Sequence, residues 1–299
     1  MDENGIKELS GFQRDNYADF LKYSLIWFVV LGHFLSFCQY KSGFGGGLYS
    51  FIYAFHMPLF VFVSGYFSKH ISYRQKNIDT LIYPFVLFQL LTILYSKIIP
   101  YFPIKESFFY PNNQLWYLLA LFWWRTFVPY RIFFKRNLVI IAAFIVSLSV
   151  GFFQDLNGFL GLFKTAYFLP FFLLGVYLND LGTFVEKLQL RKWLWIISFV
   201  LITVTIFILC ADQHALHYVN YGFKASLGYE GNIYNIIARI IAMVVSLIMC
   251  PAVLLVFKLL YNFVNNRYIV CCISGGGDDV GFLRARVHQS SINASVFTL

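Results

Sequence analysis

Two histidines interrupt apolar runs of this chain, and the spacing of their neighbours suggests chemistry. The first run carries Asp19 and Lys22 at its start and His33 eleven residues after Lys22. Eleven residues make about three helical turns, so Lys22 and His33 share one face, roughly 16 Å apart along the axis. With Lys22 at a membrane surface, His33 lies near the middle of a hydrocarbon core about 30 Å thick. A titratable group at that depth marks a candidate functional site, although a structural bond to a neighbouring helix would also explain it.

His56 stands in the next apolar run, within Phe-His-Met-Pro-Leu-Phe-Val-Phe-Val-Ser-Gly-Tyr, residues 55–66. If consecutive runs cross in opposite directions, each histidine lies about 11 or 12 residues from its inner end, and the two share one depth. Histidine titrates near neutral pH and is suited to act as a general base. We predict that His33 is the base and that His56 contacts His33 or an acceptor, with a structural role for His56 as the alternative. Gly65 offers close helix approach, and Ser64 offers a hydroxyl.

The elements that position these residues are predicted to be membrane helices. The 299 residues are 59% hydrophobic and only 12% charged, with a mean hydropathy of +0.66, whereas a soluble domain carries about 25% charged residues. The fold class is therefore all-α, a polytopic helical bundle with about eight helices. The apolar runs are 21–40, 48–67, 78–99, 114–130, 137–153, 159–178, 193–211 and 232–260.

Lysine and arginine are concentrated in alternate connecting segments, which sets the orientation. With the N-terminus in the cytoplasm, most of these residues fall on the cytoplasmic side. This bias explains the net charge of +9 without a nucleic-acid partner. The cysteines show no metal-ligand spacing, so we expect no metal. Residues 212–230 are interpreted as an outer loop.

Three regions are predicted: a cytoplasmic N-terminal segment over 1–18, a transmembrane domain over 19–267, and an atypical polar tail over 268–299. The tail lacks periodicity and is too polar to span a membrane. We hypothesise that it is a frameshifted ending and that further helices follow in the intact reading frame. A natural polar tail is the alternative, and resequencing the 3′ end of the gene decides between them.

The motifs resemble membrane acyltransferase family three, in particular the branch of fucose 4-O-acetylase-like sugar O-acetyltransferases. The resemblance rests on Asp-x-x-Lys with His33 eleven residues after the lysine and on the run over 55–66. Leu-Trp-Tyr-Leu at 115–118 and Leu-Pro-Phe-Phe-Leu-Leu-Gly at 169–175 support it, and it extends from about Arg14 to Tyr261. The family has about ten helices and an arginine where this chain has Lys22, which keeps the charge but not the planar geometry.

The resemblance implies a membrane O-acetyltransferase of the bacterial cytoplasmic (inner) membrane. Acetyl-CoA is then the donor substrate, no cofactor is bound, and the acceptor is a sugar hydroxyl of an envelope polysaccharide, an exopolysaccharide or its lipid-linked precursor. The candidate site residues are His33, Lys22 and Asp19 for catalysis, His56, Ser64, Tyr66 and Trp116 for the substrate, and Arg74, Lys76 and Arg125 for acyl-CoA.

Several of these assignments have alternatives. Trp116 also fits an interfacial aromatic belt, and the basic residues also follow from the positive-inside rule. The alternative function is a transporter or flippase of a glycolipid or polysaccharide intermediate. No oligomeric state is predicted.

Overall fold

The computed structural model describes residues 16–38, 40–69, 77–98, 107–153, 158–224 and 232–274. This part of the chain is helical and contains no strand, which confirms the all-α prediction. Short 3₁₀ turns connect or extend the helices, and a π-helical turn, Ile78–Ile82, precedes α5. The α-helices are α2 (Asn16–Phe34), α3 (Phe44–Ser68), α5 (Tyr83–Ile98), α6 (Trp116–Phe127), α7 (Arg136–Ser149), α8 (Leu162–Val176), α9 (Leu181–Leu190), α10 (Lys192–Leu209), α11 (Gln213–Lys224) and α12 (Asn232–Ser274).

All eight apolar runs form helices, and the chain is a multi-pass membrane protein. In the described part, six helical segments are long and apolar enough to cross a membrane: Tyr17–Cys38, Phe44–Ser68, Ile78–Ile98, Phe159–Val176, Lys192–Leu209 and Ile236–Asn265. The runs predicted over 114–130 and 137–153 form the shorter helices α6 and α7, of 12 and 14 residues. Both helices are flanked by 3₁₀ turns, so their regular parts are shorter than the apolar runs.

The chain divides into two units, residues 1–255 and residues 256–299, with the division inside α12. In the second unit, α12 continues to Ser274. The last 25 residues of the predicted polar tail, 275–299, lie outside the described residues, as do Arg74 and Lys76. The predicted region boundaries at residues 18 and 267 stay predictions.

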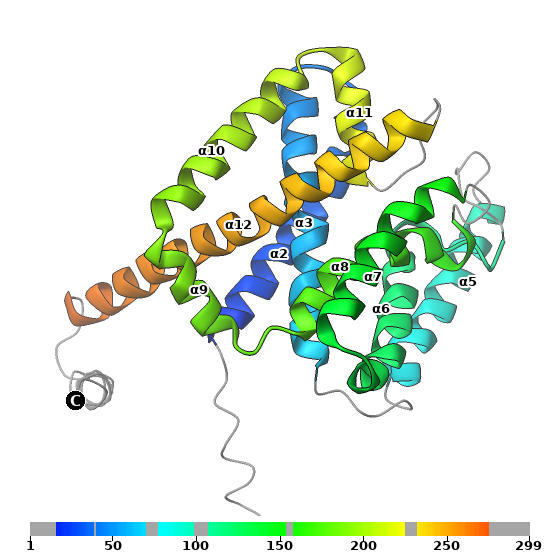
Figure 1. Cartoon of the computed structure of the whole chain (residues 1–299), viewed down its shortest axis with the longest axis horizontal. Helices are drawn as coiled ribbons and strands as arrows, with labels where there is room; N and C mark the ends of the chain where they lie inside the picture. Colours follow the sequence, from blue (N-terminus) through cyan, green and yellow to red (C-terminus); the bar gives the residue numbers. More distant parts are fainter. Residues whose placement is uncertain are drawn as a thin grey trace, which may run out of the picture. The chain divides into compact units, whose positions relative to one another are not determined.

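Helix α3 is the centre of the first unit. It contacts α2, α8, α10 and α11, and most of its residues are buried (Figure 1). Its closest neighbour is α8, because Gly65 of α3 and Gly175 of α8 leave no side chain between the two backbones. The close helix approach predicted at Gly65 is thereby confirmed.

Helix α11 corrects the interpretation of 212–230 as an outer loop. Its residues Gln213–Lys224 form a helix that packs along the first half of α3. Leu216 packs against Gly46, and Ser50 Oγ donates a hydrogen bond to Asn220 Oδ1 at 2.8 Å. Leu216, Asn220 and Phe223 are all buried at helical spacing, but polar residues between them mask the pattern in the sequence.

Candidate functional site

A polar cavity of about 250 Å³ lies between α2, α3, α8 and the turn that precedes α6. His33 and His56 both line it, as do Gln114, Trp116 and Lys164. Two histidines that stand 23 residues apart in the sequence therefore line one space. Imidazole, amide and ammonium groups around one cavity can hold a polar substrate and move a proton.

His56 is held in one orientation and one tautomer. Its Nδ1 lies 2.8 Å from the carbonyl oxygen of Ile52, one turn earlier on α3, and must donate to it. In the neutral ring Nε2 then carries the lone pair, and it has no hydrogen-bond partner among the described residues. The side chain is only 1% exposed, and the Tyr53 ring packs against it at 4.5 Å between centroids. A buried imidazole with a fixed tautomer can accept one further hydrogen bond.

Gly32 allows α2 to come close to α3 beside this ring. A Cβ atom at Gly32 would lie 3.3 Å from Cγ2 of Ile52 and 3.6 Å from Nε2 of His56. His33, the next residue, is thereby brought to the same cavity, and its side chain is partly exposed. Of the two histidines, His33 is the one that a molecule in the cavity reaches more easily.

Aromatic residues of α6 and α8 also line the cavity. Trp116 stacks on Phe168 of α8 with ring centroids 5.7 Å apart, and Lys164 Nζ lies 5.1 Å from the centroid of the Trp116 ring. Gly161 adopts a φ of +66°, and a Cβ atom there would lie 3.1 Å from Cβ of Trp116. Trp116 is 7% exposed, because it packs against Phe168 and Gly161, and its role as a substrate contact stays a prediction.

Ser64 and Arg125 lie away from this cavity and share a chain of hydrogen bonds. Ser64 Oγ is 2.6 Å from the hydroxyl of Tyr117, and Ser68 Oγ donates to the carbonyl of Ser64 at 2.6 Å. Arg125 Nε donates to Ser68 Oγ at 3.1 Å. Eight residues separate His56 from Ser64, about 12 Å along the helix. The structure therefore does not place Ser64 beside the histidines.

Lys22, Asp19 and Tyr66 also lie at the far end of α3, which ends at Ser68. Lys22 Nζ is 3.8 Å from Asp19 and 3.5 Å from the centroid of the Phe67 ring. Lys69 Nζ lies 4.2 Å from the centroid of the Tyr66 ring. Together with Arg125, these lysines form a basic end of α3, defined by Lys22, Lys69 and Arg125. The predicted site thus separates into a histidine cavity and a basic end.

Tyr49, Tyr53, Gln114 and Lys164 are among the cavity residues that sequence reasoning missed. Tyr49 and Tyr53 stack on each other with centroids 4.1 Å apart, and they lie two turns and one turn before His56. Tyr49 lies seven residues and Tyr53 three residues before His56, so all three lie on the same helix face, which is a usable signal. Lys164 carries no such signal, because only the packing of α8 against α6 and α3 brings it to the cavity.

Comparison with known proteins gives one match. The family model described as an acyltransferase domain matches residues 15–273. No curated protein and no solved structure matches the chain. Since the match covers most of the chain, including both histidines and the basic end, the chain belongs to membrane acyltransferase family three and is a membrane acyltransferase.

Proposed function

We propose that this protein transfers an acetyl group from acetyl-CoA to a sugar hydroxyl of an envelope polysaccharide, an exopolysaccharide or its lipid-linked precursor. The observation that carries the proposal is the meeting of His33 and His56 in one polar cavity, with the tautomer of His56 fixed by Ile52. A hydroxyl is a poor nucleophile until its proton is removed, and a positioned imidazole is suited to that step.

His33 is the proposed general base. It accepts the hydroxyl proton as the sugar oxygen attacks the thioester carbonyl; the C–O bond forms, the C–S bond breaks, and the proton passes to the departing thiolate of CoA. His56 is the proposed positioning residue, because its Nε2 can accept an N–H of His33 and leave the other ring nitrogen facing the substrate. A base oriented by a second fixed group is a recurring arrangement in nucleophilic catalysis.

The basic end of α3 is the proposed binding site for the phosphates of acetyl-CoA. In the proposed orientation, with a cytoplasmic N-terminus in the inner membrane, this end faces the cytoplasm, where acetyl-CoA is made. Ser68 lies 12 residues from His56, about 18 Å along the helix. The thioester of CoA is at the tip of a long, thin arm, so phosphates held at the basic end are compatible with a thioester at the histidines. Arg74 and Lys76 remain proposed donor contacts, although both lie outside the described residues.

The test is the O-acetyl content of the host's surface polysaccharides, measured by proton NMR. A gene deletion is complemented with the wild-type gene or with the His33→Ala gene, and membrane levels of the protein are compared. We expect acetyl signals to return with the wild-type gene only. If acetylation never changes while polysaccharide export does, the transferase proposal fails and the transporter alternative replaces it.

A further inference from the structure

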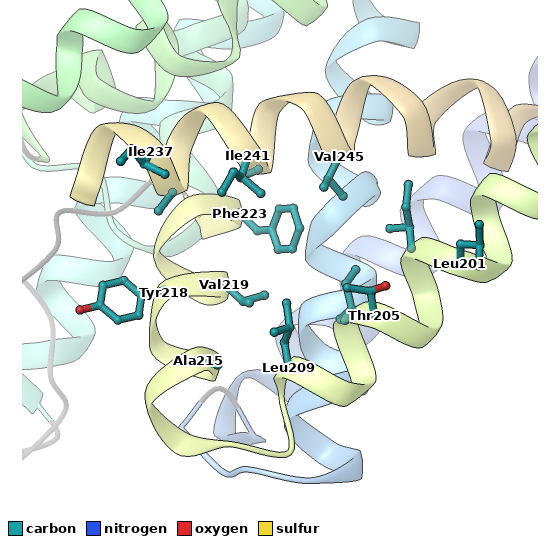
Figure 2. A pocket seen from close by; sticks show the side chains of 14 residues that line it. Leu201, Thr205, Leu209, Ala215, Tyr218, Val219, Phe223, Ile237, Ile241 and Val245 are labelled. Atoms are coloured by element: carbon teal, nitrogen blue, oxygen red, sulfur yellow. The ribbon is translucent and has the colours of Figure 1, made fainter. Parts of the chain in front are cut away.

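A second cavity of about 590 Å³ lies between α10, α11 and the first half of α12. Figure 2 shows Thr205 of α10, Val219 and Phe223 of α11, and Ile241 and Val245 of α12 around this space. Among the described residues, no charged side chain lines it. We call this cavity the apolar groove. Its volume is in the range of small-molecule sites, roughly 300–1,000 Å³.

The apolar groove lies next to the histidine cavity, because Phe223 lines both. Phe223 is 6% exposed and stands at the end of α11. The preceding residue, Gly222, holds this end in place: its carbonyl accepts a hydrogen bond from Tyr167 at 2.9 Å, and a Cβ atom there would lie 2.7 Å from Cβ of Ala242. One ring thus separates a polar space from an apolar one.

Helix α10 forms the outer side of the apolar groove and is almost unburied. Ile206 is the only buried residue of α10, so in a membrane much of this helix faces lipid. Leu201 and Leu209, which line the groove, are 61% and 42% exposed. A hydrocarbon chain can therefore enter the groove sideways from the bilayer, without passing through water.

We propose that the apolar groove binds the hydrocarbon chain of a lipid-linked acceptor, whose sugar then lies in the histidine cavity. This inference rests on the proposed function and assigns the acceptor to the class of membrane amphiphiles. A chain that leaves lipid tails for apolar side chains gains little hydrophobic free energy, since both surroundings are apolar. The groove therefore acts mainly by position: it aligns the polar head beyond Phe223 with His33.

Thr205→Trp is the variant that fills the apolar groove. Val204→Trp is its matched control, because Val204 is the neighbouring residue on α10, is 51% exposed and does not line the groove. Both substitutions place the same indole at nearly the same depth. Thr205→Val removes the hydroxyl while keeping the size of the side chain, and it separates polarity from volume.

The transfer experiment uses the full chain in lipid nanodiscs with acetyl-CoA and two acceptors, a long-chain alkyl glycoside and the methyl glycoside of the same sugar. We expect Thr205→Trp to lower kcat/KM for the alkyl glycoside by about tenfold, the scale of steric effects in apolar pockets. The methyl glycoside should be unaffected, Val204→Trp should change neither acceptor, and Thr205→Val should lower kcat/KM for the alkyl glycoside less than Thr205→Trp does. An equal loss for both acceptors, or no loss for either, overturns the proposal.

Photolabelling tests the groove without relying on transfer. The probe is the alkyl glycoside with a diazirine in its chain, and labelled peptides are mapped by mass spectrometry. We expect labels on α10 and α12 at groove residues, competition by unlabelled alkyl glycoside, and loss of label in Thr205→Trp. If excess phosphatidylcholine removes the label as well as unlabelled alkyl glycoside does, the groove holds ordinary bilayer lipid and the proposal is overturned. Crosslinks that join two copies of the protein at these residues also overturn it. If labelling is specific but no acetyl transfer occurs, the binding site for the hydrocarbon chain stands and only the proposed acetyl transfer is refuted.

Discussion

Gly65 of α3 and Gly175 of α8 lie at one crossing where the two backbones touch. A Cβ atom at Gly65 would collide with the carbonyl oxygen of Phe172, and one at Gly175 would collide with the carbonyl oxygen of Phe62. The relationship is reciprocal, since each glycine makes room for the backbone of the other helix. Small residues at such crossings let membrane helices pack through backbone contact. This crossing supports α3, which carries His56.

Gly65→Ala and Gly175→Ala should each destabilise the first unit by about 1–3 kcal/mol or more, the typical range for overpacking a tight contact. Each added methyl group meets backbone, which cannot rotate away, so the helices must separate. The double variant should lose less free energy of unfolding than the two single variants together, because one separation of the helices relieves both collisions. Unfolding of the purified protein in mixed micelles measures this free energy.

Gly45→Ala is the control on the same helix. A Cβ atom there would lie 3.1 Å from Sγ of Cys38, a side chain that can move by a few tenths of an ångström. Alanine also favours the helix by up to about 1 kcal/mol over glycine. We expect a change close to zero; a loss as large as that of Gly65→Ala would show that any added methyl group on α3 is harmful.

His33→Ala should lower acetyl transfer by about 10²- to 10⁴-fold, the usual contribution of a positioned general base. His56 should respond differently to its two amide substitutes. His56→Gln keeps an acceptor near the place of Nε2, whereas His56→Asn keeps the donor to Ile52 and loses that acceptor. We therefore expect His56→Gln to retain more activity than His56→Asn, measured as radiolabelled acetyl transferred by purified protein.

The thermal stability of each histidine variant is the control for this experiment. Loss of activity together with loss of folding in His33→Ala would leave the ring with a structural role. Equal activity in His56→Gln and His56→Asn would contradict the positioning role of Nε2, because only the glutamine variant can replace that acceptor.

The helices were largely predictable from the sequence because a membrane-spanning helix requires a long run of apolar residues. Long apolar runs imply helices wherever backbone groups cannot bond to water. Helix α11 was not predicted because it has no long apolar run: it is short and contains the polar residues Gln213, His217 and Asn220. Helix α11 is buried by packing on α3, through contacts such as the hydrogen bond between Ser50 and Asn220. The sequence of α11 alone does not identify α3 as the helix that it packs against.

The candidate site was predictable only in part, for a related reason. His33 and His56 could be matched in depth because they lie on consecutive spans of opposite direction. Ser64 was grouped with them because of its neighbourhood in the sequence, but eight residues of helix carry it roughly 12 Å away. Lys164 reaches the cavity from α8, and only the tertiary packing of α8 shows that.

Arg125→Ala should raise the KM for acetyl-CoA by about tenfold, since a hydrogen bond to a charged group is worth about 1.5–3 kcal/mol. Arg125→Lys should recover only part of the loss, because lysine lacks the planar fork and the Nε–H that bonds Ser68. Steady-state kinetics with purified protein measure both variants. The acetyl thioester of N-acetylcysteamine, which has no phosphate, is the matched donor.

With that donor, Arg125→Ala should behave like the wild type, because no phosphate is available to lose a contact. An equal rise in KM for both donors would mean that Arg125 supports the fold of α6 and α3 rather than the nucleotide part of the donor.

Asp180 caps α9 and makes the stability of that helix depend on pH. Its carboxylate accepts a hydrogen bond from the amide of Thr183 at 2.6 Å, and this bond lowers the pKa of Asp180 below its ordinary value. A depressed carboxyl pKa stabilises the folded state at pH values above the unfolded pKa of about 3.9 and loses that contribution as pH falls through the folded pKa. Asp180→Ala should therefore destabilise α9 by about 0.5–2 kcal/mol at pH 7, and by progressively less below about pH 4.

Asp180→Asn keeps an acceptor without a titratable proton, so its cap should not vary with pH. Hydrogen exchange of the Thr183 amide, corrected for its intrinsic rate, measures the effect; protection in the wild type that stays constant from pH 7 to pH 3 would contradict it.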